Sequence, residues 1–203
     1  MISDRQRLYR GVSCAAWAYF FLYFDLSFNG ISVLPNFVCY LLLWQAISFL
    51  EGEERDLALL RPLCLLLGVW VGADWLFTIF GEALDGRLPV VDLLISAAAI
   101  YFHFQLFTDF AHLAARYQSE GMELDRRLLR LRTVQTVLLT ASSLLGGWLP
   151  SGIQLFFPGN ALAEEAVSVL LVALALAGLV VSLRLMFGLF ALRKCFLPSE
   201  DKA

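Results

Sequence analysis

Six stretches of mostly apolar residues divide the chain, and they limit its fold more than any other feature of the sequence. A helix needs roughly 20 mostly apolar residues to cross about 30 Å of hydrocarbon. The second and fifth stretches are shorter than this, so we expect them to tilt or to extend into flanking residues. The pattern predicts an all-α fold, a bundle of six transmembrane helices in a single membrane-embedded domain over residues 1–203. The six stretches are 11–28, 36–50, 62–81, 89–112, 133–149 and 164–192.

Composition excludes the other broad classes of protein. Hydrophobic residues make up 60% of the chain, charged residues 16%, and the mean hydropathy is +0.73, whereas a soluble domain is about half apolar and a quarter charged. So apolar a chain does not stay disordered in water. A net charge of −3 without a basic stripe argues against binding nucleic acid. Four scattered cysteines argue against a disulfide scaffold.

The distribution of basic residues predicts the orientation. With the N-terminus in the cytoplasm, thirteen basic residues fall on the cytoplasmic side and only Arg87 falls outside, while Arg184 lies in the last apolar stretch near its inner end. This asymmetry follows the positive-inside rule. We therefore expect a multi-pass protein of the cell membrane with both termini in the cytoplasm. The thirteen are Arg5, Arg7, Arg10, Arg55, Arg61, Arg116, Arg126, Arg127, Arg130, Arg132, Arg193, Lys194 and Lys202.

The connections between the stretches have different characters. Residues 25–36 are too apolar to extend into water, so we expect an ordered outer connection there, and Pro150-Ser151-Gly152 predicts a turn. The acidic run 51–56 is interpreted as a solvated turn. The longest cytoplasmic stretch, 116–132, is interpreted as a solvated connection whose arginines anchor to lipid headgroups. The alternative for 116–132 is a docking surface for a partner.

Small residues four apart predict where helices approach closely. Gly68 and Gly72 form a G-x-x-x-G pattern, and Ala173 and Ala177 repeat the spacing in the last stretch. Such spacing lets helix backbones approach one another in lipid. We expect these residues to build the bundle, with a seam between two copies of the chain as the alternative.

Ionisable residues within the apolar stretches are the candidates for function. Each costs roughly 2.5–3.5 kcal/mol at the bilayer centre on insertion scales, and such residues often mark pathways for ions or substrates. Counting the rise of 1.5 Å per residue places Asp25 and Asp92 near the outer boundary. Asp74 falls within the outer half of the membrane, and His103 falls close to the midplane. Asp74 and His103 are therefore the two costly residues.

The spacing of these residues predicts a polar column. Asp92, Ser96 and His103 share one face of their helix, and the preceding helix is expected to run antiparallel beside it. Asp74 then lies level with Ser96, and a water or another side chain is needed to link Asp74 to His103. Because histidine exchanges protons near neutral pH, the column Asp74–Ser96–His103, with Asp92 and Asp25 above it, is a candidate ion or substrate pathway. The alternative is that these hydrogen bonds only fix the helix register.

A second polar face continues from this helix into the cytoplasmic interface. It carries Gln105, Asp109, His112 and Arg116. We expect Asp109 and Arg116 to be solvated, and a D-x-x-H pair alone is a weak indication of metal binding. No hydrolase, zinc-protease, P-loop or dinucleotide motif occurs in the sequence. We expect no catalytic residues, no cofactor and no resident metal.

A resemblance to small uncharacterised multi-pass membrane proteins of bacteria is carried by the residues from Asp25 through Asn29-Gly30 and Pro35-Asn36 to Tyr40. It extends through Leu60-Arg61-Pro62 and Tyr101-Phe102-His103-Phe104-Gln105. The resemblance implies a bacterial cell membrane and carries no activity with it. The length and the six crossings are also similar to the substrate-binding subunits of energy-coupling-factor vitamin transporters, a likeness of architecture alone.

Three functions remain open. The first is a small transporter or channel-like subunit that uses the polar column for protons, a cation or a small molecule. The second is a non-catalytic scaffold or accessory subunit that docks a partner protein. The third is an intramembrane enzyme of an unrecognised type, which the sequence favours less. The expected partners are the lipid bilayer and either a second copy of the chain or another membrane subunit.

Overall fold

The computed structural model describes residues 4–23, 27–28, 31–32, 36–81, 88–119, 121–156 and 161–197. Side chains are described for these residues apart from 27–28, 31–32, 147–156 and 161–164. The described part is helical apart from one small antiparallel ribbon, in which Ser27 pairs with Ser32 and Phe28 with Ile31. The helices are α1 (Asp4–Tyr23), α2 (Phe37–Leu50), α3 (Asp56–Leu59), α4 (Arg61–Ile79), α5 (Pro89–Tyr117), α6 (Leu124–Phe156) and α7 (Ala161–Lys194), and the strands are β1 (Ser27–Phe28) and β2 (Ile31–Ser32).

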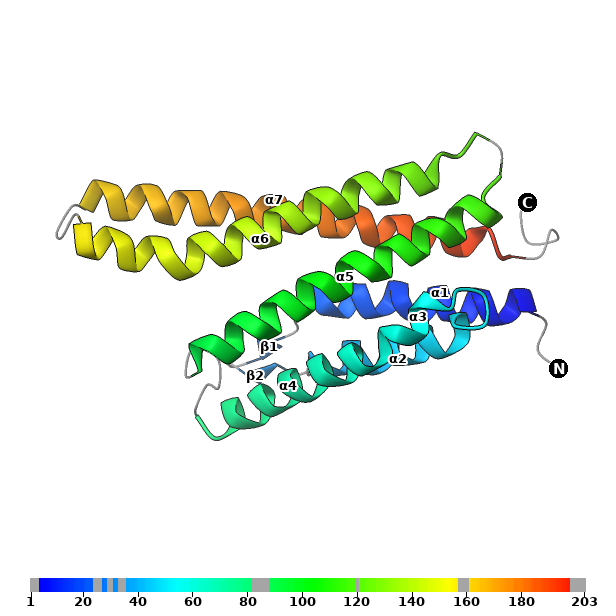
Figure 1. Cartoon of the computed structure of the whole chain (residues 1–203), viewed down its shortest axis with the longest axis horizontal. Coiled ribbons are helices and arrows are strands. Elements are labelled where there is room, and N and C mark those ends of the chain that lie inside the picture. The colour runs from blue at the N-terminus through cyan, green and yellow to red at the C-terminus, as the bar shows by residue number, and fades with distance from the viewer. Residues whose placement is uncertain are drawn as a thin grey trace.

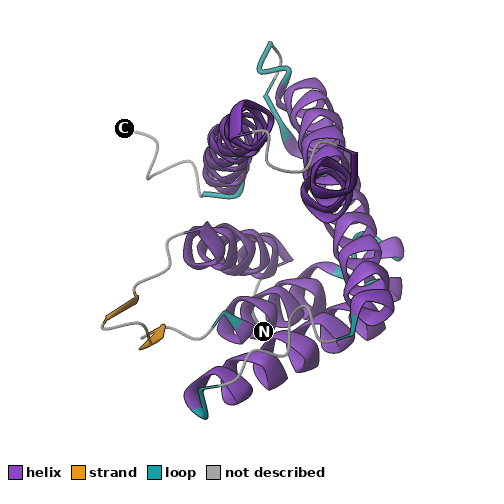
Figure 2. Ribbon diagram, turned by 90° about the vertical axis from the view of Figure 1, so that its left-hand side faces the viewer, coloured by secondary structure: helices purple, strands orange, loops and turns teal. Residues whose placement is uncertain are grey.

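The helices form one elongated bundle. Figure 1 shows α6 and α7 side by side along most of their length, with α5 crossing beneath them toward α4. Contacts join α1 to α2 and α7, α5 to α6, and α4 to both α2 and α5. The beginning of α1 and the end of α7 lie at the same end of the molecule (Figure 1). Figure 2 shows the bundle nearly end-on, with the ribbon β1–β2 at its edge.

Three helical segments are long and apolar enough to cross a membrane. They are Asp56–Ile79, Pro89–Tyr117 and Glu165–Lys194, and α2 is a shorter apolar helix. The structure therefore supports an all-α membrane protein.

Each predicted stretch overlaps one of the longer helices, but several predicted ends are wrong. The first helix spans Asp4–Tyr23 rather than 11–28, and Ser27–Phe28 is a strand. Helix α6 begins at Leu124 rather than at residue 133 and continues through the turn predicted at 150–152 to Phe156. Arginine, leucine and glutamine favour helix, so helices continue past the apolar stretches that predicted them. A proline inside a membrane helix is tolerated where neighbouring groups satisfy the freed carbonyl.

The buried core lies toward the end of the molecule that carries the start of α1 and the end of α7. Leu8, Leu57, Leu113 and Leu192 are at most 2% exposed. Toward the opposite end, α7 presents apolar side chains to the surroundings; Val169, Val172 and Leu176 are each about 60% exposed. Extensive exposed apolar surface of this kind requires lipid or a partner to cover it.

The small residues predicted to pack fall into two groups. In α4, a Cβ at Gly68 would lie 3.1 Å from Cβ of Tyr40, and one at Gly72 would lie 3.7 Å from Cβ of Phe37. These two glycines therefore let α4 approach α2 closely. Ala173 and Ala177 are exposed on α7, so the seam between two copies of the chain stays a prediction for them.

The loop before α6 is organised by one side chain. Gln118 Oε1 accepts hydrogen bonds from the backbone N–H groups of Leu124 (2.8 Å) and Asp125 (3.3 Å), while Gln118 Nε2 donates to Asp125 Oδ1 at 2.9 Å. The side-chain hydrogen bond from Gln118 lowers the pKa of Asp125 below its ordinary value. These bonds satisfy backbone donors at the start of α6, which fixes where the helix begins. Within the predicted solvated connection 116–132, the described residues are thus largely ordered helix.

Candidate functional site

His103 forms a buried hydrogen bond with the first helix. Its Nδ1 lies 2.6 Å from the hydroxyl oxygen of Tyr19. Tyr19 is 0% exposed and His103 is 9% exposed, and the two rings meet edge to face at 5.6 Å. Helix α5 supplies the histidine and α1 supplies the tyrosine. The sequence does not reveal this pair, because its two members are 84 positions apart in the chain.

A second buried bond system lies one helical turn along α1. Gln135 of α6 donates through Nε2 to the hydroxyl of Tyr23 at 2.9 Å, and the same nitrogen lies 3.4 Å from Ser182 Oγ of α7. The rings of Tyr19 and Tyr23 are stacked, with centroids 6.3 Å apart. We call Tyr19, Tyr23, His103, Gln135 and Ser182 the polar cluster. It draws together α1, α5, α6 and α7 in the interior of the bundle.

The chemistry of the polar cluster is that of groups that both donate and accept protons. A tyrosine or serine hydroxyl donates one hydrogen bond and accepts others, and a neutral histidine does both through its two ring nitrogens. Such a set is able to hold a proton, a water or a small cation within a low-dielectric interior. Sequence reasoning singled out only His103 here. Gln135 was detectable, since it is the one side-chain amide in the apolar stretch 133–149.

The remaining described residues of the predicted column lie farther toward the end of the bundle opposite the start of α1. Asp74 on α4 is half-buried, as are Asp92 and Ser96 on α5. The backbone carbonyl of Asp74 accepts a hydrogen bond from Thr78 Oγ1 at 2.9 Å. The structure joins His103 to Tyr19 through its hydrogen bond and places Asp74 on a helix that contacts α5. Asp25 lies outside the described residues.

Asp109 is fully buried, so the prediction that it is solvated is wrong. It is 0% exposed, and its Oδ1 accepts a hydrogen bond from Gln105 Nε2 at 2.9 Å. Its Oδ2 is buried without a hydrogen-bond partner among the described residues. Helix α3 contacts α5, and Glu54 in the turn before α3 lies 3.9 Å from His112, about one turn along α5 from Asp109. These contacts come from a segment distant in sequence, which helical periodicity does not reveal.

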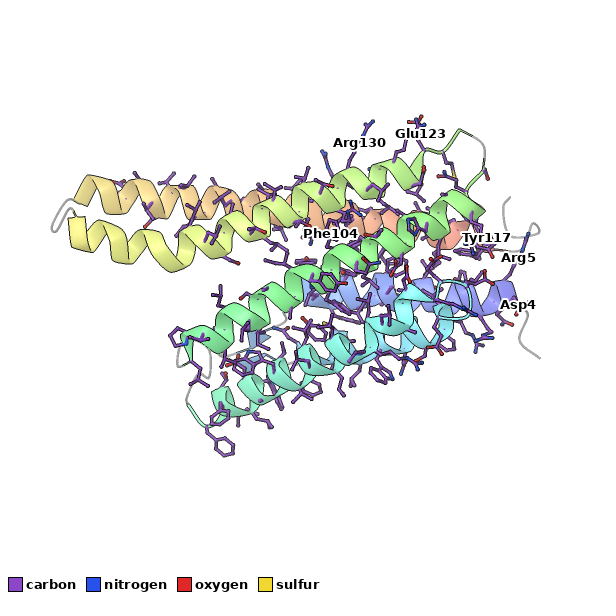
Figure 3. All side chains as sticks on the ribbon, in the orientation of Figure 1. Asp4, Arg5, Phe104, Tyr117, Glu123 and Arg130 are labelled. Carbon is purple, nitrogen blue, oxygen red and sulfur yellow. The ribbon has the colours of Figure 1, made fainter. Side chains whose placement is uncertain are left out.

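The acidic run 51–56 packs against the end of α5, which corrects its interpretation as a solvated turn. Tyr117 donates through its hydroxyl to Glu53 Oε2 at 2.9 Å. Arg116 lies 3.5 Å from Glu53 Oε2 and 3.7 Å from Glu54 Oε2, and His112 Nδ1 lies 3.9 Å from Glu54 Oε1. Arg116 itself is exposed, as predicted. Figure 3 shows Tyr117 at the end of α5, close to the start of α1.

Arg132 links α6 to α5 about one helical turn before Gln135 of the polar cluster. Its Nη1 donates to Thr108 Oγ1 at 2.7 Å, and its guanidinium carbon lies 4.0 Å from the ring centroid of Phe104. A cation over an aromatic face is stabilised by the ring quadrupole. Phe104 is labelled on α5 in Figure 3, on the stretch that runs beside α6. The charge of Arg132 is therefore held within the helix pair.

Within the described residues, no three His, Cys, Asp or Glu side chains come together as a metal site. Comparison of the chain with protein-family models, with curated proteins and with solved structures found no match. The candidate site is therefore defined by its own geometry, which is the polar cluster, with the buried Asp109 six residues farther along α5.

Proposed function

We propose that this chain is a small membrane transporter with six crossings and both termini in the cytoplasm. Helices α1, α2, α4, α5, α6 and α7 would make the crossings. The thirteen-to-one distribution of basic residues supports the orientation. The proposed cargo is a proton or a small cation, which passes through the polar cluster.

The buried hydrogen bond between Tyr19 and His103 carries the proposal. Polar side chains inside a membrane protein are costly, and they are retained where they line a path or hold the fold together. Histidine is the side chain best suited to accept and release a proton near neutral pH. The ring of Tyr19 stacks on that of Tyr23, whose hydroxyl is bonded to Gln135, so a second polar group lies one helical turn along α1 from the Tyr19–His103 bond.

Helix α5 carries polar residues along its length, on two of its faces. Asp92 and Ser96 lie toward its outer end, His103 lies near its middle, and Gln105 and Asp109 lie toward its inner end. At 1.5 Å per residue, His103 is about 16 Å along the helix from Asp92 and about 9 Å from Asp109. The buried carboxyl of Asp109 has one oxygen without a hydrogen-bond partner among the described residues. This oxygen is suited to accept a proton passing inward from His103.

The test is ion flux through purified protein in liposomes. A pH-sensitive dye inside the vesicles reports proton entry under an imposed membrane potential. We expect proton or cation flux well above that of protein-free vesicles. His103→Gln and Tyr19→Phe are expected to lower the flux roughly tenfold or more, because positioned proton transfer contributes at least this much.

Tyr101→Phe is the matched control, since Tyr101 is 56% exposed on the same helix and lies outside the polar cluster. It should leave the flux unchanged. Flux equal to that of empty vesicles under proton, sodium and potassium gradients would contradict the proposal. Full flux in folded His103→Gln protein would contradict the role of the polar cluster.

The second candidate function is a non-catalytic membrane subunit that docks a partner. It is favoured by the outer half of α7, where the small residues Ala173 and Ala177 are exposed beside Val169, Val172 and Leu176. Small residues flanked by apolar ones allow close approach of another helix. Stoichiometric copurification of a second membrane protein, lost in Ala173→Leu/Ala177→Leu and accompanied by no flux, would favour this function.

A further inference from the structure

Four arginines surround one groove where α6 begins. Arg126, Arg127 and Arg130 come from α6, and Arg184 comes from α7. The groove has a volume of about 380 Å³. Figure 3 shows Glu123 and Arg130 projecting from the edge of α6, away from the other helices. The groove therefore opens to the surroundings of the bundle rather than into its core.

The charge in this groove is strongly unbalanced. Among the residues that the structure describes, Glu123 is the only carboxylate that lines it, and Glu123 pairs with Arg126 at 3.1 Å. In the described part of the chain, no carboxylate forms an ion pair with Arg127, Arg130 or Arg184. Three guanidinium groups thus share one concave surface without a balancing anion from these residues. Such an arrangement attracts an anion.

The packing of α7 on α6 brings Arg184 to this groove. A Cβ at Gly188 would lie 2.8 Å from Cδ2 of Leu128, so the two helices approach closely at this point. On α7, Arg184 lies one turn before Gly188 and two residues after Ser182, which contacts Gln135 of α6. Its position is therefore set by packing on both sides.

The charge of Arg184 destabilises the helix in a membrane unless an anion pairs with it. It lies inside the apolar segment Glu165–Lys194, about 15 Å along the helix from Lys194. An arginine within an apolar helix is destabilising, and its cost falls when the side chain reaches an interface or an anionic group. Val180 and Phe187, one turn to either side of it, are exposed apolar residues at 50% and 61%. The groove is thus lined by arginines, and an apolar surface formed by Val180 and Phe187 lies next to it.

We propose that this groove binds the phosphate of an acidic phospholipid of the cytoplasmic leaflet. Guanidinium groups bind phosphate oxygens through paired, charge-assisted hydrogen bonds. Basic pockets between membrane helices on the cytoplasmic side suit acidic headgroups. The acyl chains lie along Val180 and Phe187, a surface that a free phosphate ion would leave uncovered. The site depends on insertion in a membrane and is independent of the proposed transport.

The test measures lipid binding by native mass spectrometry on the full chain in neutral detergent. Phosphatidylglycerol and phosphatidylcholine of equal chain length are titrated at about 150 mM salt, where long-range surface charge is screened beyond about 8 Å. We expect phosphatidylglycerol to bind at least tenfold more tightly. Arg127→Gln/Arg130→Gln/Arg184→Gln should abolish this preference.

Arg7→Gln/Arg10→Gln/Arg55→Gln is the matched control, because it removes the same charge from exposed arginines outside the groove. The control should keep the preference. Equal loss in both variants, or an unchanged preference in the groove variant, would overturn the site. Inorganic phosphate that binds the groove as tightly as phosphatidylglycerol would show a free-phosphate site and overturn the lipid assignment. If the triple variant does not fold, Arg184→Gln alone should still lower the preference, and no change would overturn the site.

Discussion

At His103, burial and hydrogen bonding are coupled through Tyr19. The two side chains share a bond of 2.6 Å in a region that excludes solvent. Tyr19→Phe keeps the ring and leaves Nδ1 of His103 unsatisfied, so we expect a loss of about 1–3 kcal/mol in the free energy of unfolding. The double variant Tyr19→Phe/His103→Leu should lose less unfolding free energy than the sum of the losses in the two single variants, because both partners of the bond are then removed together. Denaturant unfolding in detergent measures the free energy of unfolding for this double-mutant cycle. If the two single losses add up to the loss in the double variant, Tyr19 and His103 do not interact.

Asp109 differs from His103, because its carboxyl is buried while one of its oxygens has no hydrogen-bond partner among the described residues. Asp109→Asn keeps an acceptor for Gln105 and removes the group that can bind and release a proton, so we expect stability to be maintained while ion flux falls. Gln105→Leu removes the donor instead and should cost about 1–3 kcal/mol of unfolding free energy. Melting temperature and liposome flux are measured on the same preparations. An Asp109→Asn protein that is stable and fully active would exclude Asp109 from the path.

At the scale of the element, the seam between α1 and α2 depends on Gly11. A Cβ there would lie 2.7 Å from Cγ of Leu50 and 3.1 Å from Cβ of Phe49, and Leu50 is 0% exposed. Gly11→Ala should therefore separate the helices and destabilise the protein by about 1–3 kcal/mol, as overpacking does. Gly146→Ala on α6 is the control, since among the described residues nothing outside the local turn of α6 lies within 4 Å of a Cβ at that site. It should raise stability by up to about 1 kcal/mol through helix propensity. Equal effects at both glycines would contradict close packing at the seam.

For the whole molecule, the arrangement of the helices predicts which positions face each side of the membrane. The proposed six-crossing topology puts Glu123, before α6, in the cytoplasm and Ala161, at the start of α7, outside. The experiment replaces the four native cysteines by alanine and introduces Glu123→Cys or Ala161→Cys. A membrane-impermeant thiol reagent applied to intact cells should label position 161 and leave position 123 unlabelled until the cells are broken. The reverse pattern would overturn the topology.

The sequence by itself predicted the all-α membrane class and the approximate place of the longer helices. These properties are local, since a long apolar run limits both the secondary structure and the solvent of the segment that carries it. The sequence also identified His103 as a costly residue, because its depth follows from counting along one helix. It misjudged the ends of α1 and α6, where polar residues with good helix propensity carry the helix past its apolar stretch.

Only the tertiary structure decided which groups meet. The partner of His103 is Tyr19, far away in the chain, and Asp109 is fully buried on a helix that packs against α3, α4 and α6. The groove around Arg184 likewise depends on how closely Gly188 lets α7 approach α6. Periodicity places a residue on a face of its own helix, but it does not say which helix covers that face. Burial and hydrogen bonding are properties of the packed pair, and packing is set by side-chain shapes on segments distant in sequence.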